Sequence, residues 1–381
     1  MKKKDWYFII FAFLIWRFGL FVLLTLVAKF VPLETNFLGG GLENYQRNPH
    51  FWAWANFDGE HYLSIAQHGY GNGEYAFFPL FPFLIKFIEG IFGSSLASLN
   101  IAANIIVNSA FFVALIGFYK ILRLDYSEKT TKIATTLLLL FPTSFYFVSV
   151  YTESLFLAFA VWSFYQARKG NWFFASFLGI LLTATRFVGL IILPAILIEW
   201  FLQNRREKGY IKKLPGAILF IPTGLLAYMY YLDKVKHNMF AFFTDLSGFG
   251  EQRSSSLIPL PQVLYRYVFK ILPNLNTTFF PVIFTTVFEF SIGIAYLVLS
   301  IFSFFKLRLS YAVFLFFGYL VPTFSGSFSS LPRYVAVLFP AYILFALFLE
   351  KRKVILFLVC LLFFALLIIS FALYSRGYWL S

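Results

Sequence analysis

The residues best suited to chemistry lie in one short polar stretch near the start of the chain. Asp58, Glu60 and His61 fall within four positions, and Gly59 separates the two carboxylates. Side chains of these types, placed so closely, could exchange a proton with a polar substrate. Most of the surrounding chain is apolar, and ionisable residues beside a membrane are candidates for function because they are costly there without a polar partner.

Asp58 also has a structural interpretation. It could be the N-cap of a short helix over 59–67, where its side chain would accept the free N–H groups of the first turn. Tyr62 and Ile65 would then lie on one face at helical spacing. The two roles are compatible, because a base that takes a proton late in a reaction need not be strong. His61, likewise, could hydrogen-bond within its own loop instead of contacting a substrate.

Three ionisable residues further along the chain are candidates for the same site. Glu153 follows a tight turn, Arg186 has apolar residues on both sides, and Arg333 precedes an apolar run. We expect Arg186 to pair with a carboxylate such as Glu153 or Asp58. Structural alternatives stay open for the other two. Glu153 could be a solvated turn charge or a helix cap, and Arg333 could be an interfacial cation whose head reaches water.

Composition assigns the chain to a class. Of its 381 residues 60% are hydrophobic, 13% are charged and 55 are Phe, and the mean hydropathy is +0.77. These values predict an all-α, multi-pass integral membrane protein. The net charge of +14 comes from basic clusters between apolar runs, which is typical of cytoplasmic loops, so no nucleic-acid partner is expected. The single cysteine, Cys360, excludes an intrachain disulfide.

The apolar runs predict one domain, 1–381, with about eleven membrane helices. Lys2, Lys3 and Lys4 place the N-terminus in the cytoplasm, and an odd number of crossings places the C-terminus outside. The helices are expected over 6–30, 97–122, 133–150, 154–167, 172–202 as a pair, 215–232, 279–305, 311–328, 334–349 and 354–373.

Two polar segments are expected outside the membrane. The first external loop, 31–95, contains the polar stretch and an apolar helix near 82–92 that is too short to cross and should lie at the interface. The second external segment is 233–276. The range 172–202 has basic flanks at both ends, yet roughly thirty residues at ~1.5 Å each cannot cross twice in full. We therefore expect two short helices that meet near Arg186, where they line a cavity.

Two linked blocks resemble a known family. The chain is similar to the GPI mannosyltransferase 2 (PIG-V) family of GT-C glycosyltransferases in FDGEHYLSIAQHGY at 57–70 and AFFPLFP at 76–82. The family pattern usually begins Trp-Asp-Gly, and here Phe57 stands in place of the tryptophan. Similar stretches follow in the same order at 142–145 with 151–156, at 185–189, and at 333–334 with 339–340. The resemblance therefore covers most of the chain.

The resemblance implies a GT-C enzyme of the membrane that moves a mannosyl (hexosyl) residue, with inversion, from a polyprenyl-phosphate carrier to a lipid-linked or glycan acceptor on the extracytoplasmic face. Asp58 would be the general base, with Glu60 and His61 beside it. Arg333 and Arg186 would hold the donor phosphate. Substrate contacts are expected from Tyr62, Phe78, Tyr151, Glu153 and Tyr334. No cofactor and no metal are expected, although Asp58 and Glu60 could bind a divalent cation.

Two alternatives stay open. A transporter or flippase of lipid-linked saccharides would usually show internally related halves with paired broken helices. This chain shows one broken pair and no visible repeat. The sequence also cannot distinguish a mannosyltransferase from a GT-C enzyme that uses another sugar or acceptor.

Overall fold

The computed structural model describes residues 2–206, 209, 214–245 and 256–380. Over these residues the chain forms helices and turns without a β-strand, which confirms the predicted all-α class. Apolar helices of membrane-spanning length confirm the predicted multi-pass membrane protein.

Six helical segments among the described residues are long and apolar enough to cross a membrane. They are α1 (Lys3–Phe30), α6 (Leu96–Asp125), Phe187–Asn204 with α10 (Ile192–Asn204), Gly216–Lys236 with α11 (Thr223–Lys236), α14 (Phe280–Lys306) and α18 (Lys353–Ser375). Shorter helices stand among them: α7 (Glu128–Leu140), α8 (Glu153–Arg168), α9 (Trp172–Thr185), α15 (Leu309–Thr323) and α17 (Pro340–Leu349). The total of about eleven crossings stays a prediction, because the shorter helices do not reach the ~20 residues of a full span.

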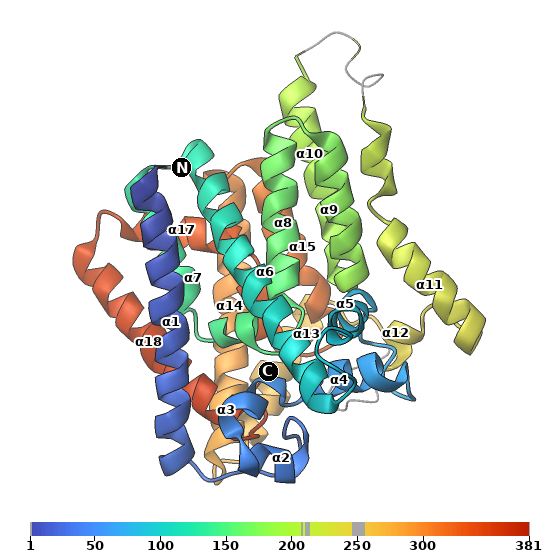
Figure 1. Cartoon of the computed structure of the whole chain (residues 1–381). Helices are drawn as coiled ribbons and strands as arrows, with labels where there is room; N and C mark the ends of the chain where they lie inside the picture. The colour runs from blue at the N-terminus through green and yellow to red at the C-terminus, as the bar shows by residue number, and fades with distance from the viewer. Residues whose placement is uncertain (1, 207–208, 210–213, 246–255, 381) are drawn as a thin grey trace.

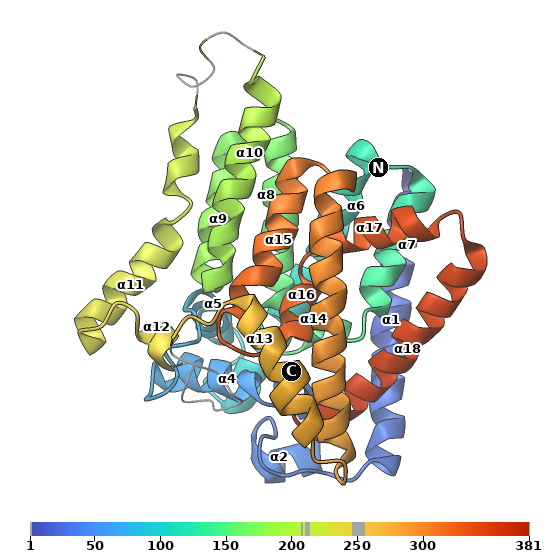
Figure 2. The same cartoon turned by 180° about the vertical axis from the view of Figure 1, so that it is seen from behind.

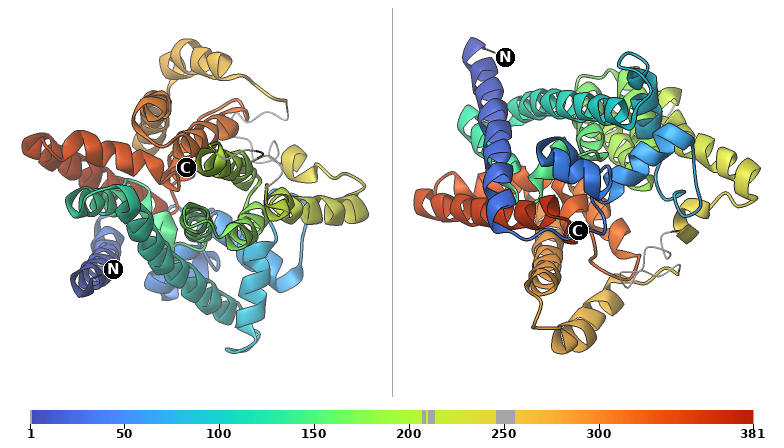
Figure 3. Two further views of the ribbon diagram at one scale, coloured as in Figure 1. Left: turned by 90° about the horizontal axis from the view of Figure 1, so that it is seen from above. Right: turned by 60° about the horizontal axis from the view of Figure 1, so that its bottom comes forward.

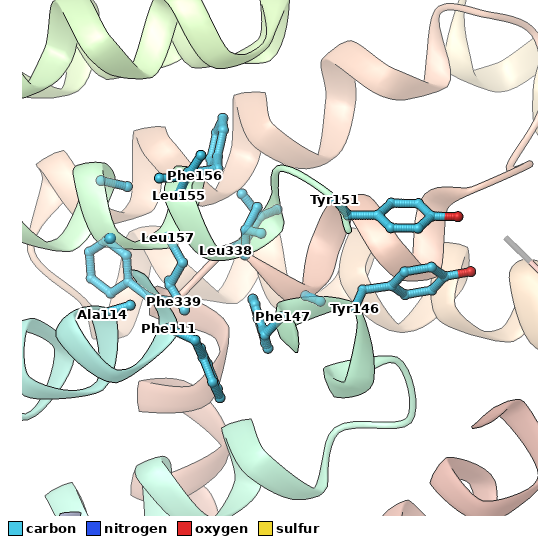
Figure 4. Close-up of a cluster of buried hydrophobic side chains, with 14 of the residues drawn as sticks. Phe111, Ala114, Tyr146, Phe147, Tyr151, Leu155, Phe156, Leu157, Leu338 and Phe339 are labelled. Atoms are coloured by element: carbon cyan, nitrogen blue, oxygen red, sulfur yellow. The ribbon is translucent and has the colours of Figure 1, made fainter. Parts of the chain in front are cut away.

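The helices stand side by side, with α8 inside the bundle (Figures 1 and 2). Helix α8 packs against α6 and α9, and α9 also packs against α11. Figure 4 shows Leu155 and Leu157 of α8 in one buried cluster with Phe111 of α6 and with Phe339. Phe111 stacks on Phe147 with ring centroids 4.6 Å apart. This aromatic core fixes the start of α8 against the rest of the bundle.

Helices α9 and α10 form the predicted pair that meets at Arg186. Arg186 has an extended backbone, and a short 3-10 helix (Phe187–Ile191) leads from it into α10. Gly189 allows this segment to fold back, because a Cβ there would lie 2.4 Å from the carbonyl oxygen of Leu182. The outer ends of both helices point toward the end of the bundle that holds the N-terminus (Figure 1).

Three expected spans are interrupted, each beside a proline. Helix α7 stops two residues before Pro142, and α15 stops just after Pro322. The third divides into α16 (Leu331–Ala336) and α17, which begins with Pro340. Proline has no N–H to donate and its ring blocks the preceding turn, so a helix ends or restarts there. The predicted continuous spans are therefore wrong in extent for 133–150, 311–328 and 334–349.

The basic loops gather with the N-terminus at one end of the bundle (Figure 1). Ion pairs tie these loops together. Lys4 lies 2.7 Å from Glu128, and Arg168 lies 2.5 Å from Asp125. The described parts of the predicted inside loops thus share one end of the molecule, as a positive-inside arrangement requires.

The predicted first external loop lies across the opposite end, as Figure 3 (right) shows. Its elements are α2 (Gly41–Arg47), α3 (Pro49–Trp52), a 3-10 turn (Ala53–Ala55), α4 (Asp58–His68) and α5 (Leu80–Glu89). Helix α5 corresponds to the short interfacial helix that was expected near 82–92. The C-terminal residues hold this layer in place: the hydroxyl of Tyr45 donates to the carbonyl of Ser375, and Asn56 donates to that of Tyr374 at 2.9 Å.

Part of the second external segment, 233–276, lies at the same end. It contains α12 (Ala241–Thr244), α13 (Leu260–Arg266) and a π-helical turn (Tyr267–Ile271). In Figures 1 and 2 both labelled helices lie toward the end of the bundle that holds α4. Residues 246–255 of this segment lie outside the described residues.

Candidate active site

A cavity of about 340 Å³ lies where α4 and α16 meet at the end of the bundle away from the N-terminus. Its titratable lining residues other than tyrosines are Asp58, His61, Arg186 and Arg333. Its wall also includes three residues that were predicted to contact substrate: Tyr62, Phe78 and Tyr334. The remaining wall is mostly apolar and aromatic. A few convergent polar groups in an apolar wall are typical of a small-ligand site. Of the predicted site residues, those outside this lining are Glu60, Tyr151 and Glu153.

The residues just before Asp58 hold it at the cavity. Phe57 has φ +57°, a backbone angle that is rare for an aromatic residue, and its N–H donates to the carbonyl of Phe37 at 3.1 Å. The side chain of the buried Asn56 accepts from the N–H of Gly39 at 2.8 Å. Helix α4 then begins at Asp58, with Phe57 in the N-cap position. The interpretation of Asp58 as an N-cap is therefore wrong.

Arg333 reaches Asp58 from the first turn of α16. Its Nη1 lies 2.5 Å from Oδ2 of Asp58, and its side chain is 4% exposed. Ser330, with φ +62°, precedes the helix, and its N–H donates to Glu289 at 3.1 Å. A guanidinium buried against a carboxylate does not reach out to water. The interpretation of Arg333 as an interfacial cation is therefore wrong.

Glu153 joins the two arginines behind the cavity wall. Its Oε1 lies 2.6 Å from Nη1 of Arg186 and 3.5 Å from Nε of Arg333, and the residue is buried. The predicted pairing of Arg186 with a carboxylate is confirmed, and the solvated-turn interpretation of Glu153 is wrong. Asp58, Arg333, Glu153 and Arg186 thus form a row of alternating charge, in which each ion offsets the desolvation of its neighbours.

Tyrosine rings frame the two arginines. The guanidinium of Arg333 lies 5.0 Å from the ring centre of Tyr151 and 5.6 Å from that of Tyr146. Figure 4 shows these two tyrosines pointing the same way. The guanidinium of Arg186 lies 4.5 Å from the ring centre of Tyr334. Such cation–π contacts are stronger when they are desolvated. Tyr151 therefore lies behind Arg333 and outside the cavity lining, and its contact with substrate stays a prediction.

His61 and Glu60 lie on different sides of α4. His61 lines the cavity, and its Nδ1 lies 3.3 Å from Oε1 of Glu74. Its ring stacks on Phe77 with centroids 4.9 Å apart. Glu60 is two residues from Asp58, roughly 200° around the helix, and burial raises the pKa of its carboxyl to about 7. The structure therefore brings Asp58 and His61 together and leaves Glu60 outside the cavity.

The described residues contain no group of three or more His, Cys, Asp or Glu side chains that could hold a metal ion. Asp58 and Glu60, the pair considered as ligands, do not share the cavity. Glu153, the other carboxylate of the charged row, already faces two arginines.

Sequence reasoning missed two residues of this region. Glu289 on α14 is buried and accepts the N–H of Ser330. A lone carboxylate within the apolar range 279–305 is the signal that could have revealed it. Trp379 lines the cavity, and its ring meets that of Phe57 edge-on with centroids 5.5 Å apart. No local pattern marks Trp379, because tertiary packing brings the C-terminal end of the chain to α4.

The fold defines a multi-pass membrane protein, and the cavity with its charged residues lies at one end of the helical bundle. The sequence model of the family described as Mannosyltransferase (PIG-V) matches residues 14–206, just over half of the chain. The chain belongs to this family and is a membrane glycosyltransferase of the GT-C fold. The match includes Asp58, Glu153 and Arg186, whereas Arg333 lies beyond it.

Family membership favours an enzyme over the transporter that the sequence had left open. No curated protein and no solved structure matches the chain.

Proposed function

We propose that the protein transfers a mannosyl residue from a polyprenyl-phosphate carrier to a lipid-linked or glycan acceptor, with inversion at the anomeric carbon. The observation that carries this proposal is the Asp58–Arg333 pair of 2.5 Å at the wall of a cavity that Arg186 also lines. The transfer releases one proton from the acceptor and gives one negative charge to the leaving phosphate. A carboxylate suits the proton, and guanidinium groups suit the phosphate.

In this mechanism the acceptor hydroxyl attacks the anomeric carbon from the face opposite the phosphate. The carbon–oxygen bond to the phosphate breaks, and its electrons leave with the phosphate oxygen. The hydroxyl proton passes to Asp58, the one Asp or Glu among the described residues that line this cavity. A lipid-phosphate sugar is already activated, so the protein contributes mainly positioning and electrostatic stabilisation.

The ion pair couples proton transfer to departure of the phosphate. Arg333 pairs with Asp58 while Asp58 is a carboxylate. When Asp58 takes the proton, its attraction for the guanidinium weakens, and the planar donors of Arg333 can bind the new phosphate charge. Arg186 lines the cavity beside it and is held by Glu153, so its position does not depend on the proton.

The prenyl chain would lie along the apolar side of the cavity. Phe187, Phe242 and Phe324 line this side. Phe187 and Phe242 pack with ring centroids 5.5 Å apart. An apolar wall next to two arginines suits a ligand that joins a hydrocarbon tail to a phosphate.

We place this site on the extracytoplasmic face of the membrane. The basic loops share the end of the bundle that holds the N-terminus (Figure 1), and the positive-inside rule assigns such an end to the cytoplasm. Helix α4, which carries Asp58, lies toward the other end (Figure 2).

The test is mannosyl transfer by the purified protein in lipid nanodiscs. Synthetic polyprenyl-phosphate mannose with a labelled sugar would be the donor, octyl α-D-mannopyranoside the acceptor, and a nucleotide-linked mannose the control donor. We expect labelled product with the lipid-phosphate donor and none with the nucleotide sugar. The new glycosidic bond should have the anomeric configuration opposite to that of the donor. Transfer from the nucleotide sugar and not from the lipid-phosphate donor would contradict the proposal.

A further inference from the structure

A second cavity, of about 390 Å³, lies on the other side of an aromatic wall from the first. Three residues line both cavities: Phe37, Phe57 and Trp379. Phe57 stacks on Phe37 with centroids 5.8 Å apart and meets Trp379 edge-on. Since Phe57 directly precedes Asp58, the second cavity borders the residue that presents the base.

The two cavities differ in charge. Arg186 and Arg333 line the first. The second is lined by two carboxylates, Glu34 and Glu289, and the described residues that line it include no Lys, Arg or His. Its other polar groups are hydroxyls and an amide, contributed by Asn36, Tyr267, Thr285, Thr286, Ser329 and Tyr378. An anionic ligand would meet repulsion here, whereas a neutral ligand rich in hydroxyl groups would find acceptors for its hydrogen bonds.

Glu289 connects the second cavity to the first. It lies on α14, 6% exposed, and accepts the N–H of Ser330 at 3.1 Å. The carbonyl of Ser330 in turn accepts the N–H of Arg333 at 3.2 Å. Glu289 thus holds Ser330, which precedes α16 and stands three positions before Arg333. A ligand that binds Glu289 would therefore contact the residue that fixes the start of this helix.

We propose that this second cavity binds the sugar head of the acceptor, as an uncharged group rich in hydroxyls. This inference rests on the proposed function, which requires a second substrate beside the lipid-phosphate donor. Carboxylates accept hydrogen bonds from sugar hydroxyls, and the rings of Phe57 and Trp379 give the sugar an apolar face to lie against. The attacking hydroxyl would reach Asp58 past Phe57. Two cavities of different charge would thus keep donor and acceptor apart until the transfer.

The experiment measures binding, without donor, of octyl α-D-mannopyranoside to the full chain in nanodiscs that contain no sugar-headed detergent. Thr286→Trp fills the second cavity, because Thr286 lines it and not the first. Val287→Trp is the matched control on the same helix, since Val287 is 45% exposed and lines neither cavity. We expect Thr286→Trp to weaken binding by about tenfold or more. Val287→Trp should leave the dissociation constant within about a factor of two.

A second arm tests the charge of the cavity. Decyl phosphate is added to occupy the arginine-lined cavity, and the mannoside is compared with its 6-phosphate. The neutral glycoside should bind at least about tenfold tighter, and Glu34→Gln should reduce that preference. Decyl phosphate binding by Thr286→Trp shows that the variant is folded.

Two results would overturn the assignment. In the first, Thr286→Trp binds the mannoside with a dissociation constant within a factor of about two of the parent's. In the second, the mannoside 6-phosphate binds as tightly as the neutral glycoside. Failure of the proposed function would look different. The mannoside would then bind and respond to Thr286→Trp as expected, but no mannose would move to it from the lipid-phosphate donor.

Discussion

Asp58 and Arg333 lie 275 positions apart in the chain and form an ion pair of 2.5 Å. A residue with positive φ stands shortly before each of them: Phe57 before Asp58, and Ser330 three positions before Arg333. The described chain has one other such non-glycine residue, His237. Strained backbone of this kind costs on the order of 1–3 kcal/mol and persists where its surroundings hold it. Both halves of the pair thus follow backbone in a costly conformation that the surrounding structure holds in place.

We predict that Asp58→Asn lowers transfer by about 10²–10⁴-fold, the range that a general base contributes. Asn keeps an oxygen that can accept a hydrogen bond from Arg333, so the loss of stability should stay below the ~3–5 kcal/mol of an unpaired buried charge. Turnover from polyprenyl-phosphate mannose and the melting temperature measure the two effects. A variant that keeps most of its turnover would show that Asp58 orients Arg333 and takes no proton.

Arg333→Lys should reduce turnover of the lipid-phosphate donor while leaving the acceptor KM within a few-fold of the parent. Lysine keeps the charge but loses the planar fork that faces Asp58 and Glu153 at once. Hydrogen bonds to a charged group are worth about 1.5–3 kcal/mol, so the decrease should be about tenfold to a hundredfold. Steady-state kinetics with each substrate varied in turn measure it. If the acceptor KM alone changes, Arg333 contacts the other substrate, and Arg186 becomes the candidate for the phosphate.

Glu153→Gln should destabilise the protein by about 3–5 kcal/mol, because it removes the anion that both arginines share behind the cavity. Ser154→Ala is the matched control at the next position of α8. Ser154 is fully buried, and its hydroxyl has no hydrogen-bond partner among the described residues. We expect that variant to be as stable as the parent, in thermal unfolding of the purified proteins. Equal melting temperatures for both variants would mean that the arginines do not depend on Glu153.

Local patterns were enough to predict the main features of the fold. Apolar runs gave the helical class, and basic flanks on both sides of one run predicted the break at Arg186. The polar stretch at 58–61 was visible because so few charges interrupt the chain. Interruptions at Pro142, Pro322 and Pro340 were missed, since hydropathy summed over a window does not register the loss of single N–H donors.

The interior of the site could not be predicted in the same way. Asp58 and Glu60 look equivalent in sequence, and the register of α4 alone decides that Asp58 faces the cavity. Tyr151 lies behind Arg333 because of how α8 packs in the aromatic core. Trp379 reaches the cavity from the far end of the chain. Each of these placements depends on tertiary contacts, which no local spacing encodes.

Single-cysteine labelling should place the two ends of the bundle on opposite sides of the membrane. In a Cys360→Ser background, cysteines at Lys169 and Arg205 replace exposed residues at the two outer ends of the α9–α10 pair, and a cysteine at Gln67 replaces an exposed residue on α4. A membrane-impermeant maleimide added to intact cells should label the Gln67 position, and the other two only after permeabilisation. The reverse pattern would put the cavity in the cytoplasm. Different labelling of Lys169 and Arg205 would contradict the hairpin.

Replacement of Glu60 should change how stability depends on pH. Burial raises the pKa of Glu60 from 4.5 to about 7 in the folded protein. Between these values the folded state holds a proton that the unfolded state has released, so this group lowers stability as pH rises from about 4.5 to about 7. Glu60→Gln removes this dependence.

The melting temperature of Glu60→Gln relative to the parent should therefore increase from about pH 5 to about pH 7.5 and then level off. Taking the difference between the two proteins cancels the titration of all other groups. Glu34→Gln is the matched substitution in the same external loop, where the side chain of Glu34 accepts hydrogen bonds from Thr35 and Asn36. A Glu60→Gln difference that stays constant over this range would mean that the carboxyl is ionised in the folded state. Glu60 would then be available as a second anion near Asp58, and its exclusion from the site would have to be reconsidered.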